Sequence, residues 1–246
     1  MHISIKPEII DTLFGIPISN SLVLSLGTAL FLLLLGFFAV RSLKPLPSKI
    51  QNAVELVLEN ILGFMAGVLG SESQAKKFFP LVATIFLFIL FNNWLGVLPG
   101  TGSIGITQVR EGKEVFVPLF RAANSDLNTA LALALISVLA LQFYGIRKLG
   151  FFGHVSKFFV LTKGPVHFFV GILELVAEVA KVLSFSFRLF GNVFAGEVLL
   201  LIMMVLVPFV VPLPFFFLEF FVGFIQALVF AMLTLIFLKI ATETAH

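Results

Sequence analysis

The sequence predicts an all-α membrane protein, and three observations support this fold class. Of the 246 residues, 59% are hydrophobic and 12% are charged, about half the charged share of a soluble domain. The mean hydropathy is +1.12, so a polar surface cannot cover these side chains in water. The apolar segments are long enough to cross the bilayer as helices, and the alternation typical of a transmembrane barrel is absent.

Five apolar segments fit transmembrane helices, which need roughly 20 apolar residues each. They comprise residues 21–40, 78–98, 127–146, 166–207 and 215–240. We treat them as one membrane domain, with an external N-terminal segment at 1–20 and an external loop at 100–126.

The distribution of positive charge predicts the orientation, because cytoplasmic loops collect Lys and Arg. Such residues follow the first span, precede the second and occupy the connection between the third and fourth. In the loop 100–126, basic and acidic residues balance each other. We therefore expect the N-terminus outside and the C-terminus in the cytoplasm. The basic residues on the cytoplasmic side include Arg41, Lys44, Lys49, Lys76, Lys77, Arg147, Lys148, Lys157, Lys163 and Lys239.

Residues 49–70 differ from the spans because glutamates interrupt their apolar positions. Val54, Leu58, Ile61 and Met65 recur at helical spacing. This pattern predicts an amphipathic helix on the cytoplasmic face, too polar to span. A loosely structured connector is the alternative.

The segment 166–207 is unusually long for a single span. No proline occurs between Glu174 and Val207, and 34 helical residues extend about 51 Å. Such a helix must tilt steeply or protrude from the bilayer. Pro208, Pro212 and Pro214 end it, and residues 215–240 return. The sequence thus predicts a long, steeply tilted C-terminal helical hairpin.

Ionisable residues in these two segments are costly in lipid and usually face a cavity or a partner. At about 100° per residue, one helical stripe collects several of them, whereas Glu197 points about 180° away from Arg188. On the return segment, Glu219 and Gln226 are seven residues apart and share a face. The stripe consists of Glu174, Glu178, Lys181, Arg188 and Asn192.

Arg188 cannot relay protons, because a guanidinium keeps its charge at accessible pH. It can instead hold a fixed positive charge beside a path and force a passing carboxylic acid to release its proton. The alternatives are an arginine satisfied by carbonyls or by one glutamate, or one that extends to the interface.

Glu197 and Glu219 suit a proton path, because carboxylic acids in an apolar interior exchange protons near neutral pH. Asn192 and Gln226 would hold waters or orient these acids. A structural pairing of the two glutamates with each other, or with a loop lysine, is the alternative. For Glu174, Glu178 and Lys181, an ion pair on a solvated face and a functional role are both open.

Further polar residues have structural interpretations. Asp126 and Asn128 fit the N-terminal cap of the third span, and Asn92 and Asn93 are candidates to line a polar interior.

Several classes of site are not expected. There is no cysteine, and none of the four histidines has metal-ligand spacing with another. Motifs for a nucleotide site or a hydrolase are missing, and the net charge of +3 reflects topology. We expect no cofactor, metal, nucleotide or nucleic acid, and no catalysis by this chain alone.

One segment carries a specific resemblance. Residues 184–197 read SFSFRLFGNVFAGE, which closely resembles the signature S-x-x-x-R-L-F-G-N-x-x-A-G-E of subunit a of F-type ATP synthases. Residues 91–100 (FNNWLGVLPG), 126–134 (DLNTALALA) and 226–230 (QALVF) are similar to the same family. Residues before Phe78 match it in layout only.

The resemblance implies that this chain is the stationary proton-channel subunit of the membrane sector. Arg188 would be the essential arginine facing the rotor ring of c subunits. Glu197 and Glu219, with Asn192 and Gln226 beside them, would form the external half-channel, and Glu174 would lie near the cytoplasmic one. The family varies at the position of Glu219, so which of the two glutamates gates access is open.

The implied partners are the c-ring, b-type peripheral stalk subunits, the lipid bilayer and the transported protons, with H⁺ or Na⁺ as the ion left open. The implied location is a bacterial plasma membrane, or alternatively an organellar inner membrane.

Two other functions are weighed against this one. A secondary transporter would also contain intramembrane charges, but its usual internal repeat is missing. A structural or assembly subunit would not need an arginine and a glutamate on opposite faces of one helix.

Overall fold

The computed structural model describes residues 6–13, 15–41, 49–110, 113–155, 165–207 and 210–242. Lys44, Lys157, Lys163 and Pro208, which the sequence analysis used, lie outside these ranges. The elements, in chain order, are β1 (Ile9–Leu13), β2 (Ile16–Ser19), α1 (Asn20–Arg41), α2 (Lys49–Leu69), α3 (Glu72–Val97), η1 (Thr101–Ser103), β3 (Gly105–Arg110), β4 (Lys113–Pro118), η2 (Ala123–Ser125), α4 (Leu127–Leu149), α5 (Phe151–Val155), α6 (Pro165–Leu206) and α7 (Pro212–Thr242).

The predicted all-α membrane class is confirmed. Six described helices are long and apolar enough to cross a membrane, one more than the five predicted spans. The additional helix is α2, which the sequence analysis judged too polar to span. Its window 51–69 meets the length and composition of a span because its glutamates are few. Its placement on the cytoplasmic face remains a prediction.

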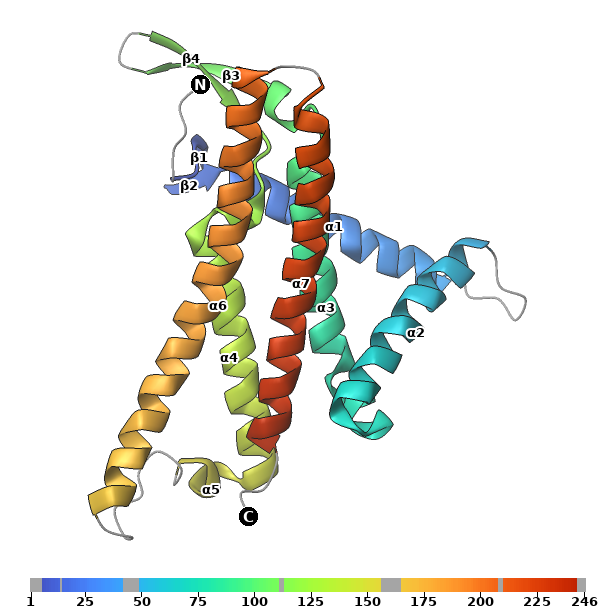
Figure 1. Cartoon of the computed structure of the whole chain (residues 1–246), viewed down its shortest axis with the longest axis vertical. Coiled ribbons are helices and arrows are strands. Elements are labelled where there is room, and N and C mark those ends of the chain that lie inside the picture. The colour runs from blue at the N-terminus through green and yellow to red at the C-terminus, as the bar shows by residue number, and fades with distance from the viewer. Residues whose placement is uncertain are drawn as a thin grey trace.

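The helices α3, α4, α6 and α7 form the packed part of the molecule (Figure 1). Helix α3 packs against α7, and α4 packs against both α6 and α7. Helix α1 contacts α3 near its own start and then departs from the bundle, and α2 returns toward α3. The far half of α1 is therefore covered with exposed apolar side chains, such as Leu33 and Phe38, as expected where lipid replaces water.

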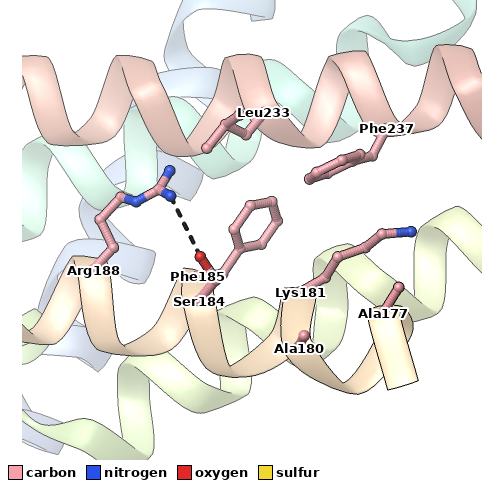
Figure 2. A pocket seen from close by; sticks show the side chains of 8 residues that line it. All are labelled: Ala177, Ala180, Lys181, Ser184, Phe185, Arg188, Leu233 and Phe237. Atoms are coloured by element: carbon pink, nitrogen blue, oxygen red, sulfur yellow. Dashed lines mark hydrogen bonds between the residues drawn. The ribbon is translucent and has the colours of Figure 1, made fainter. Parts of the chain in front are cut away.

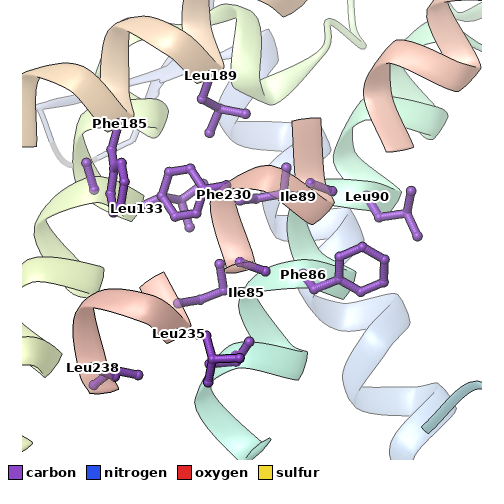
Figure 3. Close-up of a cluster of buried hydrophobic side chains, with 14 of the residues drawn as sticks. Ile85, Phe86, Ile89, Leu90, Leu133, Phe185, Leu189, Phe230, Leu235 and Leu238 are labelled. Carbon is purple, nitrogen blue, oxygen red and sulfur yellow. The ribbon is translucent and has the colours of Figure 1, made fainter. Parts of the chain in front are cut away.

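Large apolar side chains fill the centre of this four-helix packing. Figure 3 shows Ile85 and Ile89 of α3, Leu133 of α4, and Phe185 of α6 around Phe230 of α7. The rings of Phe185 and Phe230 are 5.0 Å apart. This contact joins the two arms of the C-terminal hairpin where their stripes of apolar residues meet.

The segment 49–70 is helical, as its periodicity predicted. Met65 is fully buried, and Ile61 packs against the core. Val54 and Leu58 are half-buried on the same stripe. Helix α2 packs against α3, and Ile61 and Met65 are the members of this stripe that reach the core.

The first arm of the C-terminal hairpin has the length of the predicted segment 166–207, and the second arm is five residues longer than the predicted 215–240. Helix α6 contains 42 residues, which corresponds to about 63 Å at 1.5 Å per residue. Helix α7 contains 31 residues and begins at Pro212, a position that tolerates proline because the first helical amides need no partner. The two arms lie close at the hairpin turn and diverge toward the start of α6 (Figure 1).

The loop 100–126 and the N-terminal segment contain strands that the sequence did not predict. Strands β3 and β4 form an antiparallel hairpin, as do β1 and β2. The predicted cap of α4 is confirmed, since the Asp126 carboxylate accepts from the amide of Asn128 at 2.9 Å. The Ser21 hydroxyl donates to the same carboxylate, also at 2.9 Å. This buried pair ties the start of α1 to the start of α4.

We predict that Gly96→Ala destabilises the fold, because a Cβ at Gly96 lies 2.5 Å from the Cα of Ala122. Backbone must shift to admit it, at a cost of about 1–3 kcal/mol. Thermal unfolding of the detergent-solubilised protein measures the loss. Gly67→Ala is the matched control, since no atom lies within 4 Å of that position and the substitution raises helix propensity. Equal melting temperatures for both variants would contradict the prediction.

Candidate functional site

Arg188 projects from α6 toward α7 at one end of a hollow between the two helices. The hollow has a volume of about 300 Å³ and is lined by Lys181 and Ser184 of α6 and by Leu233 and Phe237 of α7 (Figure 2). Arg188 is exposed, and its Nη2 donates to the Ser184 hydroxyl at 3.3 Å. In the described part of the chain, no acid pairs with this guanidinium. The alternative that one glutamate satisfies Arg188 is therefore not realised there.

Lys181 and Glu178 form the short-range ion pair that the sequence left open. Lys181 Nζ lies 2.6 Å from Glu178 Oε1 and 5.1 Å from the centre of the Phe237 ring on α7. The lysine thus spans the gap between the diverging arms. Glu174, one turn earlier, is exposed.

Asn192 and Gln226 connect the two arms of the hairpin. Asn192 Nδ2 donates to Gln226 Oε1 at 2.6 Å. The sequence predicted that both amides support Glu197 and Glu219. It did not predict that the two amides bond each other. Gln226 Nε2 is buried without a hydrogen-bond partner among the described residues, so this amide is free to donate a hydrogen bond to a water molecule.

Glu219 is buried on α7, 7% exposed, and its carboxylate occupies the space left by Gly196 on α6. A Cβ at Gly196 would overlap this carboxylate. Glu197 follows Gly196 directly in α6, so the Glu219 carboxylate lies beside the backbone that carries Glu197. The two acids that helical geometry assigned to separate helices therefore belong to one site.

Helix α3 holds α7 in place around Glu219. Trp94 Nε1 donates to the carbonyl of Phe220 at 3.0 Å, and Asn93 Nδ2 donates to the carbonyl of Gly223 at 3.0 Å. Asn124 of η2 donates to Asn93 Oδ1 at 2.7 Å. The predicted polar role of Asn93 is thus confirmed, because the amide lies in the interior and fixes the backbone one turn after the acid. Asn92 is also buried and donates to the carbonyl of Phe88.

Glu197 has a partner that sequence reasoning missed. Arg121, in the segment between β4 and η2, places its Nε 3.1 Å from Glu197 Oε1. The alternatives considered for Glu197 were Glu219 or a loop lysine, and the observed partner is a loop arginine. The sequence did not single out Arg121, because basic and acidic residues balance within the loop 100–126. The acidic residues of the same loop were therefore the expected partners of Arg121.

The site residues do not resemble a metal centre. Within the described ranges, no group of three or more His, Cys, Asp or Glu side chains is arranged to hold a metal ion. The chemistry available is that of two neighbouring carboxylates on one side and a fixed guanidinium on another face of α6.

Comparison with known proteins adds independent information. Residues 22–239 match the pattern of the family described as ATP synthase A chain. The chain is 34% identical over 223 residues to an ATP synthase subunit a of Campylobacter jejuni subsp. doylei, covering 89% of this chain and 88% of the relative. It is 34% identical over 224 residues to an ATP synthase subunit a of Helicobacter pylori strain Shi470, with the same coverage of both chains.

We predict that Gly196→Ala displaces the Glu219 carboxylate and lowers stability, by about 1–3 kcal/mol for an overpacked interior. Thermal unfolding in detergent measures this loss. Adding Glu219→Asp to the same chain withdraws the carboxylate by one methylene and should recover part of it. If the two substitutions were simply additive, the close approach of Gly196 and Glu219 would not be the cause.

Proposed function

We propose that this chain, which belongs to the family of ATP synthase A chains, provides two offset half-channels and a fixed arginine that faces a rotor ring. Membership makes it a multi-pass, proton-translocating subunit of the membrane sector that works with the rest of the complex and is not catalytic alone. The half-channels, the role of Arg188 and the identity of the neighbouring subunits are our proposal.

The observation that carries the proposal is the exposure of Arg188 on the apolar surface of α6. A guanidinium in lipid is costly unless it faces a cavity or a partner, and its internal hydrogen bond is to a single serine hydroxyl. Phe187, the preceding residue, is 55% exposed. Among the described residues, this surface is thus apolar around a cation that no acid neutralises. A rotating subunit that carries a carboxylic acid would complement it.

The external half-channel is supported by the arrangement of four side chains. Glu197 is partly exposed next to the external loop, whereas Glu219 is buried deeper against Gly196. The Asn192–Gln226 pair follows on the same two helices, toward Arg188. A proton would pass from Glu197 to Glu219 and then, through waters held by the two amides, to the rotor.

The coupling mechanism follows from the cost of burying charge. A rotor carboxylate that has gained the proton is neutral and can rotate through lipid, whereas its charged form cannot. After nearly a full turn it meets Arg188, whose fixed charge favours the carboxylate and releases the proton toward the cytoplasm. The same cation prevents the ring from slipping back.

The cytoplasmic half-channel would lie along the divergent part of the hairpin. The hollow below Arg188 continues past Ser184 to Lys181, and Glu174 is exposed beyond it. Because the arms separate here, released protons have a route that does not cross the packed core. Glu178 and Lys181 are assigned a structural role, since they neutralise each other.

The proposed partners are the c-ring at α6 and α7 and b-type stalk subunits elsewhere on the apolar surface. We place the N-terminus outside and the C-terminus in the cytoplasm of a bacterial plasma membrane. Basic residues at the ends of the spans support this orientation.

We predict that Arg188→Ala abolishes coupled ATP synthesis in membrane vesicles, because the rotor acid then keeps its proton or slips past. A loss of about 100-fold or more is expected for removal of such a preorganised charge. Arg188→Lys should restore little, since an ammonium lacks the planar fork of the guanidinium.

Arg147→Gln is the matched control, because this arginine is exposed near the end of α4, outside the site. Its rate of synthesis should equal that of the unmodified complex. Undiminished synthesis by Arg188→Ala, at equal amounts of assembled complex, would remove the case for Arg188.

A further inference from the structure

Arg121 is a largely buried cation at the external end of the bundle. Its side chain is 10% exposed, and a guanidinium removed from water must have its charge compensated and its donors satisfied. The Glu197 carboxylate supplies the charge, with its two oxygens 3.1 and 3.3 Å from Arg121 Nε. Ser125 Oγ shares the same Nε–H at 3.2 Å, and Arg121 Nη1 donates to the carbonyl of Lys6, also at 3.2 Å.

These contacts join parts of the chain that are distant in sequence. Glu197 lies 76 residues after Arg121, and Lys6 lies 115 residues before it. In an exposed ion pair between residues close in sequence, both side chains can also adopt other rotamers. Arg121 is instead held from two sides, so it presents its Nε to Glu197 in one orientation.

Glu197 is held on one side only. Its side chain is 28% exposed, so water reaches the carboxylate while Arg121 fixes it. Glu219, its neighbour further inside, is buried. A flexible glutamate at this point would spend much of its time turned toward the external solvent, away from the second acid.

We propose that Arg121 is a positioning residue, which holds the Glu197 carboxylate where it can take a proton from external water and pass it inward to Glu219. The assignment rests on the proposed function, because it gives Arg121 a role only if Glu197 lies in the proton path. Arg121 keeps its own proton throughout. It acts through geometry, and the N-terminal segment contributes by bonding to it.

A double-mutant cycle tests this assignment in membrane vesicles that contain the whole complex. Proton flux driven by a membrane potential is compared for the unmodified complex, Arg121→Gln, Glu197→Gln and the double variant. Arg121→Gln should lower the flux by roughly 10- to 100-fold, as expected when a reacting group is misplaced by about 1 Å. In the Glu197→Gln background the same change should alter the flux by less than about 2-fold, because the positioned acid is already absent.

Two further variants separate positioning from general stability. Arg121→Lys keeps the charge and should retain more flux than Arg121→Gln, while Arg147→Gln should leave the flux unchanged. The amount of assembled complex per membrane is measured for each variant. If Arg121→Gln does not assemble, the cycle is run with Arg121→Lys, whose smaller loss should likewise vanish beside Glu197→Gln.

The outcomes distinguish the two proposals. An equal fold-loss from the Arg121 substitution in both backgrounds, with assembly intact, would overturn the positioning role and leave the proposed function standing. An undiminished flux in Glu197→Gln alone would remove Glu197 from the path, and the role of Arg121 with it.

Discussion

The absence of water in the bilayer interior constrains every polar group in this chain. A backbone or side-chain group there must find its partner inside the protein or face another subunit. The Asn124 amide donates to Asn93, the Asn93 amide donates to the backbone of α7, and Asn192 bonds Gln226. These bonds set the spacing of α3, α6 and α7, and with it the distance between the groups that would carry protons.

The same constraint distinguishes the two arginines of the site by the number of hydrogen-bond partners that each finds inside the chain. Arg188 is exposed and bonds one serine hydroxyl, whereas Arg121 is buried and bonds a carboxylate, a hydroxyl and a carbonyl. Both are permanent cations, yet Arg121 is largely buried within the chain and Arg188 is exposed at the hollow between α6 and α7. This difference assigns Arg121 to internal geometry and Arg188 to the proposed contact with a rotor.

Close approach of backbone and side chain shapes the acidic part of the site. Glu219 is accommodated because Gly196 has no side chain, and α7 is held there by Trp94 and Asn93. The hairpin arms then diverge, leaving the hollow at Arg188. Tight packing at the acids and open space at the arginine are thus two consequences of one tilt between α6 and α7.

The sequence by itself determined the membrane class, the helical hairpin, the cap at Asp126 and the opposite faces of Arg188 and Glu197. These features depend on composition and on a periodicity of a few residues, which local sequence contains. Only the tertiary structure decided that Glu197 pairs with Arg121, that Glu219 rests against Gly196, and that Asn192 meets Gln226. These partners come from different helices or loops, and their contact depends on helix tilt and loop path, which no local pattern encodes.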